Sequence, residues 1–530
     1  MMGENSRVTK AAGVIGAATL LSRIFGFLRD VVIAGYFGAG LASDAFFVAF
    51  RIPNLLRRLF AEGSLTIAFI PVFTETLTTK GKNDAFQLAG ATLRVLSVLL
   101  AATAVIGIFA APLVIYAIAP GFLDSPEKYK LTVTLTRVMF PYIFFIGLVA
   151  LFMGILNALD HFAAPALAPV FLNLAMIGSV LFLSPHMKKP IIGLAVGVLI
   201  GGVLQLLLQL PFVIRKGVRF WRNASWFHPA LKRIGSLMLP AVFGAAVYQI
   251  NIFVATLLAS LLPEGSVSYL YYADRLVQFP LGIFAIATAT AVLPSLSRQA
   301  AAKDYPALRE TFSHAMRLVL FITVPSMVGL IVLREPIVTL LFKRGAFDMN
   351  TSRMTAVALL YYGLGLWAFS AVRVVVSVYY ALQDTRTPVR MAVVSLLVNI
   401  CLGILLMGPL RHGGLALATS LASMVNFFLL VWFLRRKIGM LQWHEIMSST
   451  GRTLFCSGVM ALATYGIKSV ALQSHSAGMW RLGIGLTAAI LLSMLVYAGC
   501  AAAFKSPEMA MILKIINRPG WRRHRPKDII

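Results

Sequence analysis

Residues 22–63 of the chain read SRIFGFLRDVVIAGYFGAGLASDAFFVAFRIPNLLRRLFAEG. The stretch has the apolar composition of membrane helices, yet it carries eight charged side chains. A charge near the centre of a bilayer costs at least ~2.5–3.5 kcal/mol, so it persists where it faces water, a partner or a ligand. Five of the eight are arginines, and this excess of positive charge predicts an anionic substrate. The eight are Arg23, Arg29, Asp30, Asp44, Arg51, Arg57, Arg58 and Glu62.

The composition of the whole chain is that of a polytopic membrane protein. Of its 530 residues, 59% are hydrophobic and only 12% are charged, whereas a soluble globular chain carries about 25% charged residues. The net charge of +28 comes from basic residues dispersed over short loops. This pattern favours cytoplasmic loop retention and contact with anionic lipid, so we expect membrane lipids as partners and no nucleic acid.

Apolar segments of about 20 residues predict membrane helices, and the fold class expected is all-α. Lys and Arg are concentrated in alternate loops, which predicts that both termini are cytoplasmic. Prolines at positions 53, 141, 240, 280 and 325 are candidate kinks. We count fourteen segments, at residues 11–38, 41–78, 86–118, 130–157, 163–184, 190–214, 232–262, 267–298, 307–342, 351–383, 388–408, 412–434, 448–471 and 480–504.

A weak internal repeat underlies these segments. APLVIYAIAPG (111–121) aligns with EPIVTLLFKRG (335–345), and VAFRI (48–52) aligns with YADRL (272–276), both at an offset of 224. Six spans per repeat give both halves the same orientation, which predicts two pseudo-symmetric six-helix lobes with a substrate path between them. The predicted parts are residues 1–222 (helices 1–6), 223–440 (helices 7–12), 441–505 (helices 13 and 14) and 506–530 (a basic cytoplasmic tail).

The second predicted helix carries a stripe of charges. Asp44, Arg51, Arg58 and Glu62 are spaced by 7, 7 and 4 residues, which places them on one face if the helix is continuous. Pro53 interrupts the stretch and leaves the register across it open. The alternative is a cluster of side chains that reach out to the cytoplasmic interface, and the apolar sequence after Arg58 fits that alternative poorly.

Arginines outside this stripe complete the candidate site. Arg23 and Arg29 are six residues apart and cannot share a narrow helix face. Arg29 is available to pair with Asp30 or Asp44, which leaves Arg23 as the better candidate for a free cavity charge. Arg275 occupies the repeat position of Arg51, with Asp274 beside it. Because arginine binds phosphate groups through a planar fork, a phosphorylated or diphosphate substrate is the simplest hypothesis.

Catalytic motifs are absent from the sequence. It contains no HExxH pair, no Walker A loop and no G-x-S-x-G elbow, so we expect a transporter and not an enzyme. We expect no cofactor. Transport would be coupled to the membrane potential or to a monovalent cation, and the sequence leaves that choice open. The three cysteines have no metal-type spacing and are interpreted as small apolar residues.

Three segments closely resemble the MurJ/MviN family of lipid II flippases, which belongs to the multidrug/oligosaccharidyl-lipid/polysaccharide exporter superfamily. They are SRIFGFLRD (22–30), GAGLASDAFFVAFRIPNLLRRLFAEG (38–63) and SYLYYADRLVQFPLGIF (268–284). The resemblance implies a monomeric fourteen-helix transporter of the bacterial inner membrane with a central cavity. It also implies that helices 13 and 14 form a groove for the polyprenyl tail of lipid II.

The function implied is translocation of undecaprenyl-diphosphate-linked peptidoglycan precursor from the cytoplasmic to the outer leaflet by alternating access. The alternatives are a drug/cation antiporter, another polyprenyl-linked oligosaccharide flippase of the superfamily, or a non-transporting scaffold for wall synthesis. An antiporter predicts a cavity dominated by carboxylates. The candidate substrate-binding residues are Arg23, Arg29, Asp44, Arg57, Arg58, Glu62, Asp274 and Arg275.

Overall fold

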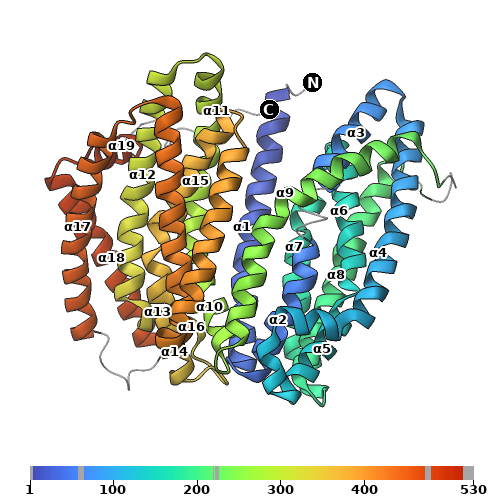
Figure 1. The fold of residues 1–530 in the computed structure, drawn as a ribbon, viewed down its shortest axis with the longest axis horizontal. Helices are drawn as coiled ribbons and strands as arrows, with labels where there is room; N and C mark the ends of the chain where they lie inside the picture. Colours follow the sequence, from blue (N-terminus) through green and yellow to red (C-terminus); the bar gives the residue numbers. More distant parts are fainter. Residues whose placement is uncertain (1–3, 58–64, 219, 221–225, 472–478, 517–530) are drawn as a thin grey trace, which may run out of the picture. The chain divides into compact units, whose positions relative to one another are not determined.

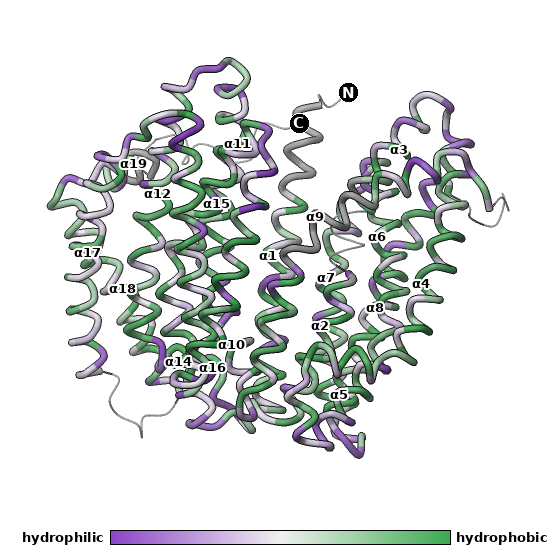
Figure 2. Tube along the Cα trace, in the orientation of Figure 1, coloured by the Kyte–Doolittle hydropathy of each residue, from purple (hydrophilic) through white to green (hydrophobic). Residues whose placement is uncertain are grey.

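A computed structural model describes residues 4–57, 65–218, 220, 226–471 and 479–516 (Figure 1). Every regular element within these ranges is a helix, and the predicted all-α fold class is confirmed. Hydrophobic residues cover the middle of the helices, whereas hydrophilic residues gather towards their ends (Figure 2). This distribution matches a bilayer, in which the helix satisfies its own backbone hydrogen bonds and presents apolar side chains to lipid.

Contacts divide the chain into two units, of which the first comprises residues 1–271 and 342–351. In this unit α7 packs along α8 and α1, and α2 packs against α5. The helices are α1 (Glu4–Phe37), α2 (Leu41–Arg57), α3 (Leu65–Thr79), α4 (Lys82–Ile118), η2 (Pro120–Asp124), α5 (Pro126–Met139), α6 (Tyr142–Ala158), α7 (Ala163–Gly178), η3 (Ser179–Leu183), η4 (Ser184–His186), α8 (Pro190–Arg215) and α9 (Pro229–Ser260).

The second unit comprises residues 272–341 and 352–530. Here α12 packs against α17, α15 and α11, and α17 packs against α18 (Figure 1). Two of its helices, α10 (Ser266–Pro280) and α14 (Met349–Leu364), begin in the first unit, and α13 (Arg334–Phe342) has its last residue there. The others are η5 (Leu281–Ala285), α11 (Ile286–Ala301), α12 (Tyr305–Val332), α15 (Leu366–Ala381), α16 (Arg386–Ile438), α17 (Trp443–Ala471), α18 (Met479–Ala503) and α19 (Pro507–Ile516).

All fourteen predicted segments are helical over most of their described residues, and turns interrupt three of them, at Phe140–Pro141, Leu333 and Gly365. By length and hydropathy, eight helices in the described ranges are able to cross a membrane, or nine if α14 and α15, bent by 41°, form one span. This is compatible with fourteen spans, whose exact number stays a prediction. The boundary at residue 271 places α9 in the first unit, whereas the sequence predicted residues 223–440 as one lobe. The lobe boundaries also stay a prediction.

The long helix α16 is a hairpin of two arms, as predicted from the segments 388–408 and 412–434. Arg411 has non-helical dihedral angles, with φ of 50° and ψ of −132°. The hydroxyl of Ser395 donates to the carbonyl of Ala422, 27 residues away. Because an uninterrupted helix separates such residues by about 40 Å, the arms must lie antiparallel. The residue at the centre of this turn is Arg411.

Proline marks two interruptions of the predicted spans. Pro141 lies between α5 and α6, and Pro280 ends α10 where the π-helical turn η5 begins. Proline lacks the N–H that would continue the helix ladder, so helices bend or break beside it. Both breaks lie inside stretches that are long and apolar enough to cross a membrane, Pro126–Ala158 and Ser266–Ala301.

Asp384 lies in the loop between α15 and α16, and it connects this loop to the far end of α16 through Lys437. Its carboxylate accepts hydrogen bonds from Lys437 Nζ at 2.8 Å and from the Thr387 hydroxyl at 2.7 Å. Burial alone would raise the pKa of Asp384, but the hydrogen bonds from Lys437 and Thr387 hold it well below the ordinary value of 3.8. The ionised form of Asp384 therefore stabilises this end of the unit.

Candidate functional site

Arg29 and Asp30 form a buried polar cluster in the first unit. Arg29 Nη2 lies 2.7 Å from Asp30 Oδ1, and the two residues are 7% and 2% exposed. Arg29 Nη1 donates to Asn173 Oδ1 on α7 at 3.0 Å, and the Tyr271 hydroxyl donates to Asp30 Oδ1 at 3.1 Å. Of the two partners predicted for Arg29, Asp30 is the one it pairs with. The pair holds α1 against α7 and the first turns of α10.

Asp44 is a second buried carboxylate, and both of its oxygens accept hydrogen bonds from groups of the protein. It is 1% exposed and accepts hydrogen bonds from Lys128 Nζ at 2.8 Å and from the Ser268 hydroxyl at 2.7 Å. The backbone N–H groups of Gly265 and Ser268 also donate to it, at 2.8 and 3.0 Å. A carboxylate at a helix N-terminus satisfies free N–H groups and complements the helix dipole. These contacts give Asp44 a positioning role between α2, α5 and α10.

The repeat offset of 224 reappears in these contacts. Asp44 and Ser268 are 224 residues apart, and the same offset relates Phe47 to Tyr271. Their rings stack with centroids 3.9 Å apart. These contacts within the first unit follow the repeat that the sequence predicts.

A second pair of close backbone approaches follows the same offset. A Cβ on Gly121 would lie 2.3 Å from the carbonyl oxygen of Ser260, at the end of α9. A Cβ on Gly345, the repeat equivalent of Gly121, would lie 2.3 Å from the carbonyl oxygen of Gly35, near the end of α1. Only glycine permits such contact, and Gly345 also has a φ of +52°. The ends of α1 and α9 are thus held by equivalent turns.

The remaining predicted arginines of the first unit have more open surroundings. Arg23 is exposed on α1, and within the described part of the chain it has no hydrogen-bond or ion-pair partner. Arg57 is half-buried, and its guanidinium donates to Asn54 Oδ1 at 2.9 and 3.1 Å. Among the candidate residues that the structure describes, Arg23 is therefore the cation best placed to take an external anion. Arg58 and Glu62 lie outside the described residues.

Asp274 and Arg275 are half-buried on the part of α10 that belongs to the second unit. The Gln278 side-chain amide donates to the Asp274 carboxylate one helical turn away. Arg51, the repeat equivalent of Arg275, donates to the Thr256 hydroxyl and to the Ile252 carbonyl on α9. The direct binding roles predicted for these charges are untested by their contacts.

Every buried carboxylate in the described ranges has a cation beside it. Asp30 pairs with Arg29 and Asp44 with Lys128. Glu508 on α19 is 5% exposed and lies 3.8 Å from Arg317 Nε on α12. Burial alone would raise the pKa of Glu508, but hydrogen bonds from Ser506 and Ser449 and the charge of Arg317 lower it. These acids are structural anchors, because each lies against a basic side chain of the protein.

Sequence reasoning missed Lys128, Asn173, Ser268 and Tyr271 as partners of the charged cluster. Ser268 and Tyr271 could have been found, since they stand at the repeat positions of Asp44 and Phe47. Lys128 lies between the predicted segments 86–118 and 130–157, where a loop charge is expected, but it is 6% exposed. Asn173 offers no pattern in sequence that points to Arg29.

With this geometry in place, the chain can be compared with known proteins. A family model described as lipid II flippase MurJ matches residues 33–492. The chain belongs to the MurJ family. A probable lipid II flippase MurJ of Vibrio cholerae serotype O1 is 40% identical over 511 residues, which are 92% of this chain and 96% of the relative. The lipid II flippase MurJ of Burkholderia cenocepacia is 38% identical and covers 81% of this chain and 84% of its own length.

Solved structures agree with MurJ membership. A lipid II flippase MurJ in an inward closed conformation superposes with a TM-score of 0.77 at 29% identity, covering 92% of this chain and 98% of its own. An inward-facing multidrug resistance MATE family transporter of the MOP superfamily gives a TM-score of 0.67 at 16% identity, covering 81% and 99%. At that identity the second similarity shows the fold alone. The family resemblance drawn from residues 22–63 and 268–284 is confirmed.

Proposed function

We propose that the chain is a lipid II flippase that moves the undecaprenyl-diphosphate-linked peptidoglycan precursor from the cytoplasmic to the periplasmic leaflet of the bacterial inner membrane. The observation that carries this proposal is the match to the MurJ family over residues 33–492. The protein is a multi-pass membrane transporter of cell-wall synthesis. Both termini are cytoplasmic in this proposal, and the functional form is a monomer without enzymatic activity or nucleic-acid partner.

The charges support an anionic substrate over a cation. A drug/cation antiporter needs a carboxylate that is free to exchange protons or cations. In the described ranges, the buried acids Asp30, Asp44 and Glu508 are each paired with a basic side chain. Arg23, by contrast, is exposed and without a protein partner among the described residues. An arginine in this state suits the diphosphate of lipid II, which it can bind through two parallel hydrogen bonds.

We assign direct contact with the diphosphate to Arg23, Arg57 and Arg275, and positioning of the surrounding helices to Arg29 and Asp44. The cycle is alternating access, with the sugar–pentapeptide in a wet cavity. Coupling is to the membrane potential or to a monovalent cation gradient. A cationic site would respond to the potential with ~2.3 kcal/mol per charge moved through 100 mV.

We assign binding of the polyprenyl tail to α17 and α18, which correspond to the predicted segments 448–471 and 480–504. They pack on each other through the Thr464 and Ser493 hydroxyls, 2.6 Å apart, and Tyr497 donates to the Phe321 carbonyl on α12 at 2.7 Å. Their outer faces carry exposed apolar side chains such as Leu462, 77% exposed, and Leu495, 67% exposed. Such a face suits a long isoprenoid chain.

The test is a rescue experiment in bacteria depleted of their own flippase. Expression of the full chain should restore lipid II in the outer leaflet, measured by its accessibility to an externally added lipid II-cleaving enzyme. A gain of drug efflux on expression, without restored lipid II exposure, would support the antiporter instead. Restored growth with no outward movement of lipid II would support a scaffold.

A further inference from the structure

The turn between α16 and α17 carries a pocket that the proposed flipping site does not use. It has a volume of about 310 Å³ and lies entirely in the second unit. Gly439, with φ of +86°, ends α16 and allows the chain to turn back over the helix end. Arg309 Nη1 donates to the Met440 carbonyl at 3.3 Å and fixes the turn against α12. The lining residues are Arg435, Met440, Leu441, Gln442, Trp443 and His444.

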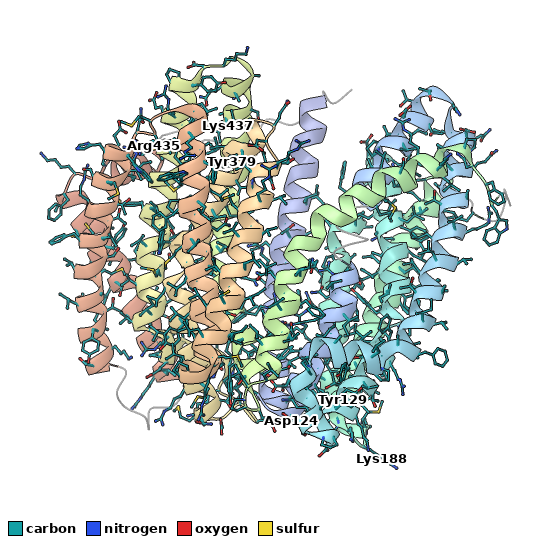
Figure 3. The ribbon with its side chains drawn as sticks, viewed as in Figure 1. Asp124, Tyr129, Lys188, Tyr379, Arg435 and Lys437 are labelled. Carbon is teal, nitrogen blue, oxygen red and sulfur yellow. The ribbon has the colours of Figure 1, made fainter. Side chains whose placement is uncertain are left out.

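Three consecutive cations end α16, and their surroundings differ. Lys437 is committed to Asp384 at 2.8 Å. The Arg436 guanidinium lies over the Trp432 ring, 5.1 Å from its centroid. Arg435 is exposed, and its Nη2 donates to the sulfur of Met440 at 3.3 Å, the one side-chain hydrogen bond of Arg435 within the described residues. Arg435 and Lys437 lie at the same end of the unit as Tyr379 (Figure 3).

The carboxylates beside the pocket are already neutralised. Glu445, in the first turn of α17, lies 3.4 Å from Arg317 Nη1, and Asp384 is held by Lys437. Within the described ranges Arg435 therefore has no acidic partner, while it lines the pocket. A guanidinium in this setting is a binding group for an external phosphate.

Two further features distinguish a phospholipid from a free anion. Gln442 lines the pocket, and its Oε1 is buried and accepts no hydrogen bond from the described residues. If the side chain rotates towards the pocket, a hydroxyl of a lipid headgroup can donate the missing hydrogen bond. Beyond the pocket, apolar side chains of α16 and α17 stay exposed, including Trp432 at 59%, Met447 at 65% and Phe455 at 56%. Trp and basic residues at helix ends are typical of the membrane interface.

We propose that this pocket binds the headgroup of an inner-leaflet phosphatidylglycerol, with its phosphate on Arg435, its glycerol hydroxyls towards Gln442 and its acyl chains along α16 and α17. The proposal is independent of lipid II transport. It assigns to the α16–α17 turn a resident anionic lipid that holds these helices at the interface.

Native mass spectrometry of the purified full chain tests this assignment. The probes are dioleoyl phosphatidylglycerol, dioleoyl phosphatidylcholine and free glycerol phosphate. We expect at least a fivefold preference for phosphatidylglycerol over phosphatidylcholine. Arg435→Gln should weaken phosphatidylglycerol binding about tenfold, because it removes the charged hydrogen-bond donor to the lipid phosphate. Arg436→Gln, the matched control one residue along the helix, should change it less than twofold.

If both variants lose phosphatidylglycerol binding equally, the lipid is attracted by the overall surface charge, and the proposed binding in the pocket is wrong. Equal binding of the two lipids would overturn the headgroup selectivity. Displacement of the lipid by free glycerol phosphate at equal concentration would show a soluble anion site instead. If Arg435→Gln does not fold, Trp443→Leu, which removes an aromatic wall of the pocket, must reduce the phosphatidylglycerol preference, and an unchanged preference would contradict the proposal.

Discussion

Replacing Asp44 with asparagine removes one charge from the buried pair with Lys128. The side chains of the two residues are 1% and 8% exposed, and Asp44 Oδ2 lies 2.8 Å from Lys128 Nζ. Asparagine has nearly the same size, and its one side-chain oxygen can still accept the hydrogen bonds from the N–H and the hydroxyl of Ser268. Lys128 is then left as a buried charge without its counter-ion, which costs about 3–5 kcal/mol in comparable sites. We predict that Asp44→Asn lowers the free energy of unfolding by about 3 kcal/mol.

A double-mutant cycle separates the pair from the other contacts of Asp44. Lys128→Met alone should also destabilise the chain, because it leaves Asp44 with only its neutral donors. The double variant carries neither buried charge, so its loss should be smaller than the sum of the single losses by about 2 kcal/mol, within the range seen for contacting residues. The assay is equilibrium unfolding of the purified full chain in a mild detergent, followed by tryptophan fluorescence.

Asp124→Asn is the matched control, because Asp124 is an exposed acid on η2 in the same unit. Its replacement should cost less than about 0.5 kcal/mol, the usual effect of a surface substitution. Equal losses for Asp44→Asn and Asp124→Asn would refute the reasoning. So would a coupling energy below about 0.5 kcal/mol between Asp44 and Lys128, the limit for independent sites.

Two further predictions concern the turns that hold the helix ends. Gly345→Ala should lower the free energy of unfolding by about 2 kcal/mol, because its Cβ would meet the Gly35 carbonyl. The control Gly178→Ala should leave stability unchanged, because a Cβ there has nothing within 4 Å. Equal effects of the two variants in thermal unfolding would rule out the close approach at Gly345. The stability advantage of wild type over Asp384→Asn should hold above about pH 5 and shrink as the pH falls below the ordinary carboxyl value of 3.8, because the lowered pKa of the folded Asp384 stabilises only the ionised form. A wild-type advantage that stays constant from pH 7 to pH 3 would contradict the role of the Asp384–Lys437 pair.

Hydropathy predicted the helices well because each span must satisfy its own backbone in lipid. The break at Arg411 was anticipated, since charge and Gly–Pro residues separate the segments 388–408 and 412–434. The division of the segment 307–342 into α12 and α13 was missed. The charged residues Arg334 and Glu335 stand at that division. The 41° bend between α14 and α15 was also missed, because apolar residues continue through it and carry no signal of direction.

The candidate site was only partly readable from the sequence. Adjacent opposite charges on one helix pointed to the Arg29–Asp30 pair, and the repeat offset connects Asp44 with Ser268. Lys128 could not be assigned to Asp44, because the two lie 84 residues apart and no periodicity links α2 to α5. Long-range pairing of single charges depends on tertiary packing, which one sequence does not encode in a local pattern.

We propose above all that the exposed Arg23 binds the diphosphate of lipid II during transport. The most direct test measures outer-leaflet lipid II in flippase-depleted bacteria that express wild type, Arg23→Ala or the control Arg137→Ala at equal membrane levels. Arg137 is exposed on α5 and donates to the Ile108 carbonyl. The account predicts that Arg23→Ala leaves lipid II unexposed while Arg137→Ala matches wild type. Normal exposure of lipid II with Arg23→Ala would contradict it.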